Sequence, residues 1–362
     1  MKSTKWLLIN IFFTILFLLI IISLNFYIDT YATRLSLFGI KKEIGQMKFM
    51  APINQHIFKT EYIFRDPNRF DSFIFGSSRT GVIDPAKINS GKFYNMSYSL
   101  GLPSQHLAII KAFLQKGVKI KTVIIGLDEF SFNLSPKEHE KQLERIMHPS
   151  VTGRLLSDIF CTYYLRVPKL FELGNGIKLF FNDDRGGKFV LNEKGLHMFW
   201  VKKEKEIELM GKPLFTMDTI QVSPKSFDKK LEDEAFVQIQ ELILLAKKND
   251  FRLIIFFNPL STNFYMPYAS SLYAVKQKLA SLTDYYDFSG LDSVTLNNYN
   301  YYEGVHYRYL VGDMIIKRIF DCGNINIPGD FGVLVTKKNV NEHIQKQKQE
   351  LEKYLVKKEM VQ

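Results

Sequence analysis

The chain is poor in cysteine, and this scarcity already limits its class. Two cysteines among 362 residues exclude a small scaffold built on disulfides and a zinc site with four thiolate ligands. Acidic residues are also outnumbered, 37 to 48 by Lys and Arg, which leaves a net charge of +11. This balance favours acidic partners such as phospholipid headgroups or anionic glycans. No cluster of basic residues lies in a recognisable nucleic-acid-binding motif, so no nucleic-acid partner is expected.

Long hydrophobic runs are absent except at the beginning of the chain. Residues 6–28 (WLLINIFFTILFLLIIISLNFYI) contain no charge. As a helix they extend about 34 Å, enough to cross a hydrocarbon core of roughly 30 Å. The run is longer than the apolar region of a signal peptide, although Ala32 leaves a cleavable signal open as an alternative. We therefore expect a lipid-bilayer anchor here, with residues 1–29 forming a cytoplasmic head and a transmembrane signal anchor.

The charges that flank residues 6–28 are nearly balanced, so they fix the orientation only weakly. Lys2 and Lys5 precede the run, and further basic residues follow it closely. A short head before a long body is the usual signal-anchor arrangement. We thus expect the short head in the cytoplasm and the body on the extra-cytoplasmic side of the membrane. In that compartment Cys161 and Cys322 can form a disulfide if their geometry allows it.

The body alternates short strands with helices, which predicts an α/β fold. Parallel strands joined by helical crossovers form a doubly wound sheet, so we expect a three-layer α/β/α sandwich with a parallel, flavodoxin-like sheet. Ligands of such sheets bind beyond the carboxyl ends of the strands. The expected strands are 72–75, 92–94, 122–126, 253–257 and 284–288, and the expected helices are 106–115, 235–248, 268–282 and 310–320.

The same pattern predicts four further parts of the chain. Residues 30–69 are mixed in character and are interpreted as a juxtamembrane stalk, and residues 70–321 form the α/β domain. Within that domain, residues 131–227 interrupt the alternation and are interpreted as an insertion or cap beside the site. Residues 322–362 form a C-terminal extension whose helix is amphipathic. That helix is either a solvated surface or a docking or oligomerising element.

Ser78 is the first candidate for chemistry. It lies in GSSRT, directly after the first predicted strand. A serine at this place has its hydroxyl exposed at the edge of the sheet, and the amides of a helix start favour developing negative charge. The alternative is an ordinary helix cap, because Ser and Thr commonly fill that position.

His306 and Glu303 are the second candidate. A serine hydroxyl needs a base, and a neutral histidine suits that role. A carboxylate three residues earlier in a tight loop can bind the other ring nitrogen and fix the tautomer. The alternative is a loop histidine beside an exposed glutamate. No histidine pair has metal-ligand spacing, so neither a metal nor another cofactor is expected.

These residues resemble the sequence blocks of the SGNH (GDSL-type) hydrolase superfamily. The first block is Gly-Asp-Ser, and residues 76–78 read Gly-Ser-Ser, so Ser78 matches the family's nucleophile. The second block supplies an oxyanion-hole glycine, and residues 95–101 (NMSYSLG) are similar with the glycine one position late. The resemblance therefore assigns the oxyanion hole to the backbone amides of Ser78 and of Leu100 or Gly101.

The last two blocks also match, with one departure. The family's Asp-x-x-His becomes Glu303-x-x-His306, a conservative exchange. Its Gly-x-Asn-Asp becomes Gly-Leu-Asp-Glu at 126–129, which places Asp128 where an asparagine donates to the oxyanion. An ionised Asp128 repels an oxyanion, and losing one donor typically costs about 10²–10³ in rate. Four alternatives stay open: Asp128 is protonated, it holds another group, the hole relies on backbone amides, or catalysis has been lost.

The single span, LNFYIDTY after it, VIIGLDEFSF and YYEGVHYR resemble a membrane-anchored subgroup of SGNH-like proteins in bacterial envelope-polysaccharide systems. That subgroup is close to the alginate and teichoic-acid acylation proteins. The resemblance implies a serine esterase or O-acyltransferase acting on an envelope polysaccharide or another acylated glycan. It also implies a location in the inner (cytoplasmic) membrane of a bacterium, with the body on the periplasmic side. One alternative is an inactive SGNH-like protein that binds glycan or a membrane-bound acyltransferase, and another is an unrelated α/β membrane-anchored protein in which the blocks match by coincidence. Tyrosines 301, 302, 307 and 309 are expected either to stack on sugars or to pack at the rim.

Overall fold

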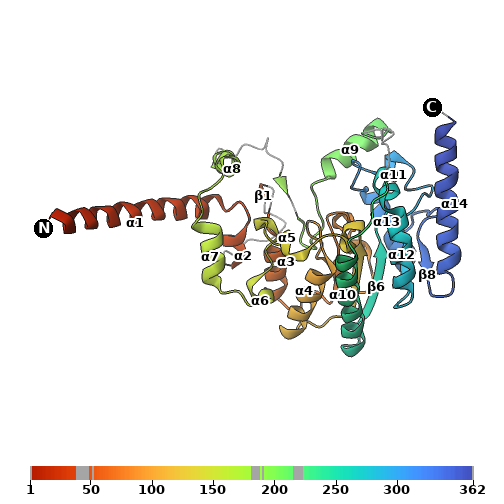
Figure 1. Ribbon diagram of the computed structural model, residues 1–362, viewed down its shortest axis with the longest axis horizontal. Coiled ribbons are helices and arrows are strands. Elements are labelled where there is room, and N and C mark those ends of the chain that lie inside the picture. Colours follow the sequence, from red (N-terminus) through yellow and green to blue (C-terminus); the bar gives the residue numbers. More distant parts are fainter. Residues whose placement is uncertain are drawn as a thin grey trace. The chain divides into compact units, whose positions relative to one another are not determined.

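The computed structural model describes residues 2–37, 49–50, 53–180, 188–189, 191–214 and 223–360 (Figure 1). Parts of the predicted stalk and of the predicted insertion lie outside these residues. The chain divides into two compact units. We call residues 1–65 and 140–190 the anchor unit, and residues 66–139 and 191–362 the sheet unit.

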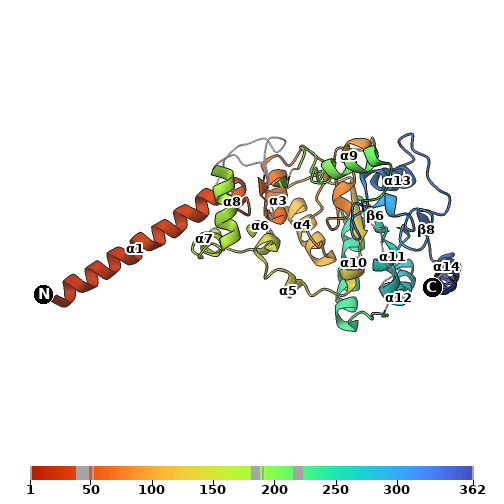
Figure 2. The same ribbon diagram turned by 90° about the horizontal axis from the view of Figure 1, so that it is seen from above.

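The anchor unit begins with one long apolar helix. Helix α1 (Lys2–Ile28) includes the predicted span and is long and apolar enough to cross a membrane, as a signal sequence also can be. Its first three quarters are exposed, and its buried residues are Ile21, Asn25 and Ile28. Helices α7 (Leu156–Tyr164) and α8 (Leu170–Phe180) flank the C-terminal end of α1 in both views (Figures 1 and 2).

Residues expected to form a stalk fold together with part of the expected insertion. Asn54 joins the two segments, because its amide donates to the carbonyl oxygens of Leu143 (2.9 Å) and Ile146 (2.8 Å) and to the hydroxyl of Tyr163 (2.8 Å). Ile57 packs in the same small core as Ile146 and Tyr163. The remaining elements of this unit are α2 (Thr33–Leu37), β1 (Phe49–Met50), α3 (Gln55–Arg65), α6 (Pro149–Thr152) and β5 (Lys188–Phe189), with β1 antiparallel to β5.

The sheet unit is α/β, and its sheet is mostly parallel. Its six strands are ordered β3-β2-β4-β6-β7-β8, and all are parallel to their neighbours except β8. The expected strands occur within two residues of their predicted bounds, and β8 was not expected. The strands are β2 (Ser72–Phe75), β3 (Phe93–Asn95), β4 (Thr122–Leu127), β6 (Arg252–Phe257), β7 (Tyr285–Asp287) and β8 (Val333–Val335).

The central strands are apolar because both of their faces are covered. On one face Ile74, Ile124 and Ile254 share a core with Val311 and Ile315 of α13 (Tyr309–Phe320). On the other face, Phe73 of β2 packs against Phe113 of α4 (Pro103–Gln115). Phe257 of β6 packs against Phe132, which in turn contacts Phe236 of α10 (Lys229–Lys248). The other helices of this unit are α5 (Pro136–His139), α9 (Val201–Met210), α11 (Thr262–Tyr265) and α12 (Ala269–Ala280).

The C-terminal extension belongs to the sheet unit. Strand β8 pairs with β7, and helix α14 (Val340–Glu359) lies beside α12. Two side chains of α14 reach β7, since His343 Nε2 lies 2.8 Å from Asp287 Oδ2 and Gln347 Nε2 donates to the same oxygen at 3.2 Å. The extension is therefore packed on its own chain. Cys161, in the anchor unit, and Cys322, in the sheet unit, are both free thiols.

The strand order determines where a site can form. From β2 the chain goes first to β3 on one side and then to β4 on the other side. The loops after β2 and β4 consequently diverge and leave room at their shared edge, where α/β proteins bind ligands. Ser78 follows β2 by three residues and Asp128 follows β4 directly, so the sheet brings both to this edge.

Candidate active site

Ser78 lies in a tight turn at the carboxyl end of β2. Gly76 makes the turn possible, since its φ of +149° is rarely adopted by residues with side chains, and a Cβ there would lie 2.5 Å from Thr80 Oγ1. The expected α-helix does not follow: the turn leads only into a 3₁₀ segment, Thr80–Val82. A helix dipole therefore adds little here. The hydroxyl that accepts a backbone N–H in this turn is that of Ser77, from Arg79 at 3.2 Å.

The structure brings the three predicted catalytic side chains together. Ser78 Oγ lies 2.8 Å from His306 Nε2, although 228 positions separate them in the chain. On the far side of the ring, His306 Nδ1 hydrogen-bonds Glu303 Oε1. With the proton on Nδ1, Nε2 is free to accept the serine proton. The ring and the carboxylate are partly open to solvent, with side-chain exposures of 20% and 40%.

The charge of Glu303 is stabilised by its neighbours. Partial burial raises the pKa of the Glu303 carboxyl, but the hydrogen bond and charge of His306, together with Lys203, outweigh burial and hold this pKa below its usual value. Glu303 is thus a carboxylate at neutral pH, the form that accepts the Nδ1 proton and fixes the imidazole.

The loop that carries His306 is fixed by packing as well as by hydrogen bonds. Its two strands meet as an isolated bridge, and Tyr302 N donates to His306 O at 2.9 Å. Trp200 packs over the loop, with its ring centroid 4.9 Å from that of Tyr302 and 5.0 Å from that of His306. Arg308 then ties the end of the loop to α9 through Glu204 at 2.8 Å. The imidazole is therefore held from both sides.

A second cluster of charges lies directly behind the serine. The Arg79 guanidinium donates from Nη1 to Asp128 Oδ1 at 2.6 Å and to Glu129 Oε2 at 2.7 Å, and from Nη2 to Glu129 Oε1 at 3.1 Å. Its Nε donates to the carbonyl oxygen of Val305 at 3.0 Å. The three charged side chains are buried, at 8% exposure or less. Arg79 thus connects the serine turn, the end of β4 and the histidine loop.

The register of the sheet explains this second cluster. Phe75 pairs with Ile125, so three residues further on, Ser78 and Asp128 come level, and Arg79 and Glu129 follow. β4 and β6 continue this register, and Asn258 Nδ2 donates to Asp128 Oδ1 at 3.2 Å. Of the alternatives for Asp128, the structure shows that it holds another group, Arg79.

Burial makes the charge of Asp128 costly. Desolvation raises the pKa of the Asp128 carboxyl, Arg79 opposes this, and repulsion from Glu129 adds to it, so the pKa of Asp128 lies above its usual value. Two carboxylates share one guanidinium, and a proton on Asp128 makes the cluster neutral. A protonated Asp128 retains an O–H donor, as the asparagine of the resembling family retains an amide.

Gly101 and Leu100 lie next to the serine turn, as the resemblance implies. A Cβ on Gly101 would lie 2.4 Å from the carbonyl oxygen of Gly76, so only glycine allows this approach. Leu100 has a φ of +50°, an uncommon backbone conformation for a residue with a side chain. Within the described chain, the backbone amides of Ser78, Leu100 and Gly101 donate no hydrogen bond to a protein acceptor. These amides are available to an oxyanion.

The tyrosines around His306 pack rather than face a ligand. Tyr301, Tyr302 and Tyr307 are buried in the core beside α13, and the Tyr309 hydroxyl donates to the His197 carbonyl oxygen. Their interpretation as sugar-stacking surfaces is therefore wrong for the three buried rings. Aromatic edges that do reach solvent nearby are Phe199, which contacts Trp200, and Phe264, which lies against Gly304.

Sequence reasoning missed Arg79, Glu129, Asn258 and Trp200. The charged pair could be found only from the register of β2 and β4, since Arg79 and Glu129 each come four residues after the paired residues Phe75 and Ile125. The residues around Trp200 in the sequence do not predict that this side chain packs on the ring of His306, about a hundred residues later.

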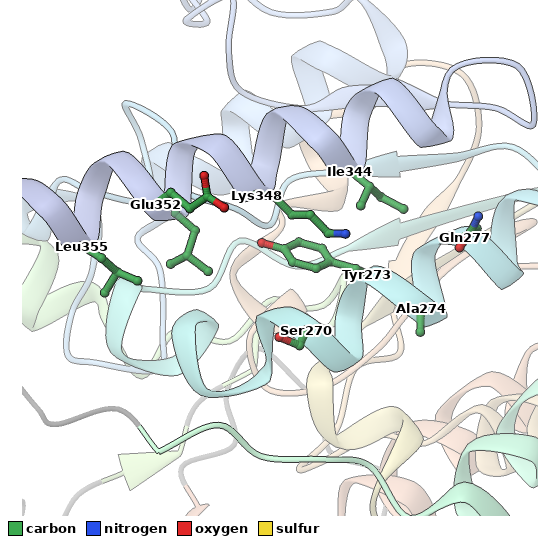
Figure 3. A pocket seen from close by; sticks show the side chains of 9 residues that line it. Ser270, Tyr273, Ala274, Gln277, Ile344, Lys348, Glu352 and Leu355 are labelled. Carbon is green, nitrogen blue, oxygen red and sulfur yellow. The ribbon is translucent and has the colours of Figure 1, made fainter.

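A groove of the sheet unit lies away from this site. It has a volume of about 500 Å³ and lies between α12 and α14, where Tyr273 projects between the helices near Ile344 and Lys348 (Figure 3). Its lining includes no predicted site residue. Across the described residues, no group of three His, Cys, Asp or Glu side chains is placed to hold a metal ion.

Comparison with protein-family models and with curated protein sequences finds no match for this chain. The site is therefore interpreted from its own geometry and from the sequence blocks described above.

Proposed function

We propose that the chain is a membrane-anchored serine acyl-ester hydrolase or O-acyltransferase of the SGNH-like type, acting on an extra-cytoplasmic envelope polysaccharide. The observation that carries this proposal is the line of Ser78 Oγ, His306 Nε2 and Glu303 at the carboxyl edge of the sheet, with 2.8 Å between hydroxyl and imidazole. That line is what nucleophilic activation of a serine requires.

The proposed reaction proceeds in two halves. Ser78 Oγ attacks the ester carbonyl carbon while its proton passes to His306 Nε2. The resulting oxyanion is bound by the amides of Ser78 and of Leu100 or Gly101, with a protonated Asp128 as a further donor. The bond to the leaving alcohol breaks, and His306 returns the proton to that alcohol's oxygen. Water or a sugar hydroxyl then attacks the acyl carbon, losing its proton to His306. The bond from that carbon to Ser78 Oγ breaks, and His306 returns the proton to Oγ.

The topology is consistent with this proposal. Numbered along the chain, the parallel strands follow the order 2-1-3-4-5, which is the flavodoxin-like order of a doubly wound sheet. Helix α13 on one face and α4 and α10 on the other fit a three-layer α/β/α sandwich, the SGNH-like arrangement. The apolar helix α1 fits an anchor in the inner membrane with the body on the periplasmic side.

The surroundings of the serine suit an ester of a glycan. Phe199 and Phe264, at 43% and 36% exposure, offer apolar faces near the His306 loop for an acyl group or a sugar ring. The net charge of +11 favours an anionic polymer. No step of the proposed reaction needs a metal or another cofactor.

One observation favours a second candidate function. Asp128 is paired with Arg79 at 2.6 Å, where the family's asparagine is a free oxyanion donor. If this pair removes the donor, the same fold serves as an inactive protein that binds glycan or a membrane-bound acyltransferase.

A fluorophosphonate probe tests the nucleophile directly. The purified full-length chain in detergent should be labelled, and Ser78→Ala should abolish labelling. Ser271→Ala, which removes a hydroxyl from α12, is the matched control and should be labelled like the wild type. Labelling that persists in Ser78→Ala would refute the assignment of Ser78.

Acetate release from acetylated envelope polysaccharide then tests the function. We expect release by the wild type and a loss of about 10⁴-fold or more in His306→Ala. Equal release by both proteins, or none by a wild type that binds the polysaccharide, favours the second candidate. Adding an acceptor oligosaccharide distinguishes hydrolysis from transfer, because transfer leaves the acetyl group on the acceptor.

A further inference from the structure

The anchor unit has an apolar surface that the proposed reaction does not use. Between the end of α7 and the middle of α8, five large apolar side chains are exposed. We call them the interfacial face: Leu165 (39%), Val167 (72%), Leu170 (88%), Phe171 (48%) and Ile177 (59%). Isolated exposed leucines are ordinary, but five within thirteen residues form a patch of the kind that marks a contact with lipid or protein.

The orientation of α8 is inverted relative to that of a helix facing water. Its acidic residue, Glu172, is 1% exposed, whereas Leu170, Phe171 and Ile177 of the same helix are exposed. The buried position is stabilised, because Glu172 accepts from Arg166 (2.8 Å), from the Tyr31 hydroxyl (2.9 Å) and from the Lys169 amide (2.7 Å). Among the α8 residues whose side chains the structure describes, the exposed ones are therefore all apolar, which favours an apolar environment around them.

The interfacial face is continuous with the surface around α1. Asn25 of α1 donates to the carbonyl oxygens of Tyr164 (3.1 Å) and Arg166 (2.7 Å), which directly flank Leu165. α8 also lies beside this end of α1 (Figures 1 and 2). The patch thus begins where the apolar helix meets the rest of its unit.

The length of α1 indicates how deep in the bilayer the contact between α1 and the rest of the anchor unit lies. A hydrocarbon core of roughly 30 Å takes about 20 helical residues. If the core begins near Trp6, it ends near Asn25, and Ile21 lies about 6 Å inside it. Ile21 and Asn25 are buried by the anchor unit. The elements that cover them therefore reach the boundary between headgroups and acyl chains.

We propose that the interfacial face rests in the lipid–water interface of the bilayer that α1 crosses, with Leu170, Phe171 and Ile177 among the upper acyl chains. Interfacial helices insert their apolar side by about 5–10 Å in this way. The inference rests on α1 remaining in the membrane as an anchor, and it does not depend on the chemistry at Ser78. It adds a second membrane contact that fixes how the anchor unit is tilted.

Site-directed fluorescence on the full-length chain tests this proposal. The chain is reconstituted in nanodiscs of phosphatidylcholine and phosphatidylglycerol after Cys161→Ser and Cys322→Ser. An NBD probe is attached to Leu170→Cys or Ile177→Cys. Leu244→Cys on α10 is the matched control, an apolar helix residue with 64% exposure in the sheet unit. Leu16→Cys in α1 reports whether the anchor itself lies in lipid.

We expect a nitroxide on the lipid acyl chains to quench positions 170 and 177 at least about twofold more than position 244, and aqueous iodide to quench in the opposite order. Positions 170 and 177 that behave like 244, while position 16 is quenched by lipid, overturn the proposal and leave the anchor intact. Protection from both quenchers also overturns it, in favour of a protein or a second copy. Position 16 without lipid quenching removes the anchor on which the proposal rests.

Discussion

Two clusters of charged side chains lie side by side at one edge of the sheet, and they differ in their exposure to solvent. Ser78, His306 and Glu303 are partly exposed, and their hydrogen bonds form a line that ends at a hydroxyl. Arg79, Asp128 and Glu129 are buried, and their hydrogen bonds form a closed set. The first arrangement leaves an atom free to react, whereas in the second all three nitrogens of Arg79 donate to acceptors in neighbouring loops.

The comparison suggests a division of labour. The open line carries the proposed chemistry, and the closed cluster holds the turns that aim it, because Arg79 bonds to the β4 end and to the Val305 carbonyl oxygen in the histidine loop. A buried ion pair is costly to break, since the partner charge is left without compensation. Changes to the closed cluster should therefore appear first in stability, and changes to the open line first in rate.

Breaking the closed cluster should have the largest effect. Arg79→Met leaves Asp128 and Glu129 buried without a cation, so we expect the free energy of unfolding to fall by about 3–5 kcal/mol, with activity falling as the loops separate. Urea denaturation of the full-length chain in detergent measures this. Arg79→Lys keeps the charge but not the fork of hydrogen bonds and should lie between the two. Wild-type stability for Arg79→Met would contradict the division proposed here.

Breaking the open line at its exposed end should change rate without changing stability. Glu303→Gln cannot hold the Nδ1 proton as a carboxylate does, so we expect kcat/KM to fall by about 10²-fold, less than for a buried triad acid because water reaches this position. The free energy of unfolding should change by less than about 1 kcal/mol. Glu303→Asp, the family's residue, should retain most of the activity. A stability loss as large as that of Arg79→Met would argue against the comparison.

Replacing Asp128 by the neutral asparagine should have the smallest of the three effects on the molecule. Because the pKa of Asp128 is raised by burial, its ionised form weakens the fold, and wild-type stability should fall as pH rises through that pKa. Asp128→Asn has no such titration, so its stability advantage over the wild type should grow in denaturation experiments as the pH rises above about 3.9, the usual pKa of an aspartate.

The same variant reports on the oxyanion hole. Asp128→Asn restores an amide donor, and we expect kcat/KM at pH 8 to rise by about tenfold. Glu129→Gln is the matched control, because it relieves the same crowding of charge without adding a donor at position 128. Equal increases in both variants would assign the gain to charge alone, and a large loss in Asp128→Asn would show that Arg79 needs the carboxylate.

Much of the sheet was predictable because its strands are buried on both faces. Apolar runs such as 72–75 and 122–127 are strong signals, and the structure places them as expected. Strand β8 gives no such signal, since it has three residues at the edge and is only partly buried. The anchor unit was not predicted as a unit, because its core joins Asn54 to a segment about ninety positions later through side-chain contacts.

The contact of Ser78 with His306 and Glu303 was predictable from their places in the sequence. Ser78 directly follows a predicted strand, and the other two residues directly precede a predicted helix of the same α/β domain. The role of Arg79 was not, because burial of a guanidinium depends on two carboxylates from another strand being level with it. The residues next to Arg79 in the sequence do not indicate which carboxylates it will meet. The register of β2 with β4 indicates this once the strand order is known.

The separation of 228 positions between the serine and its base has a consequence for biosynthesis. A chain released or interrupted anywhere before residue 306 carries a hydroxyl with nothing to activate it. If the proposed function holds, the site is complete only after residues 303–306 have been synthesised and have folded against the turn that carries Ser78, and fragments that lack these residues should not react with esters.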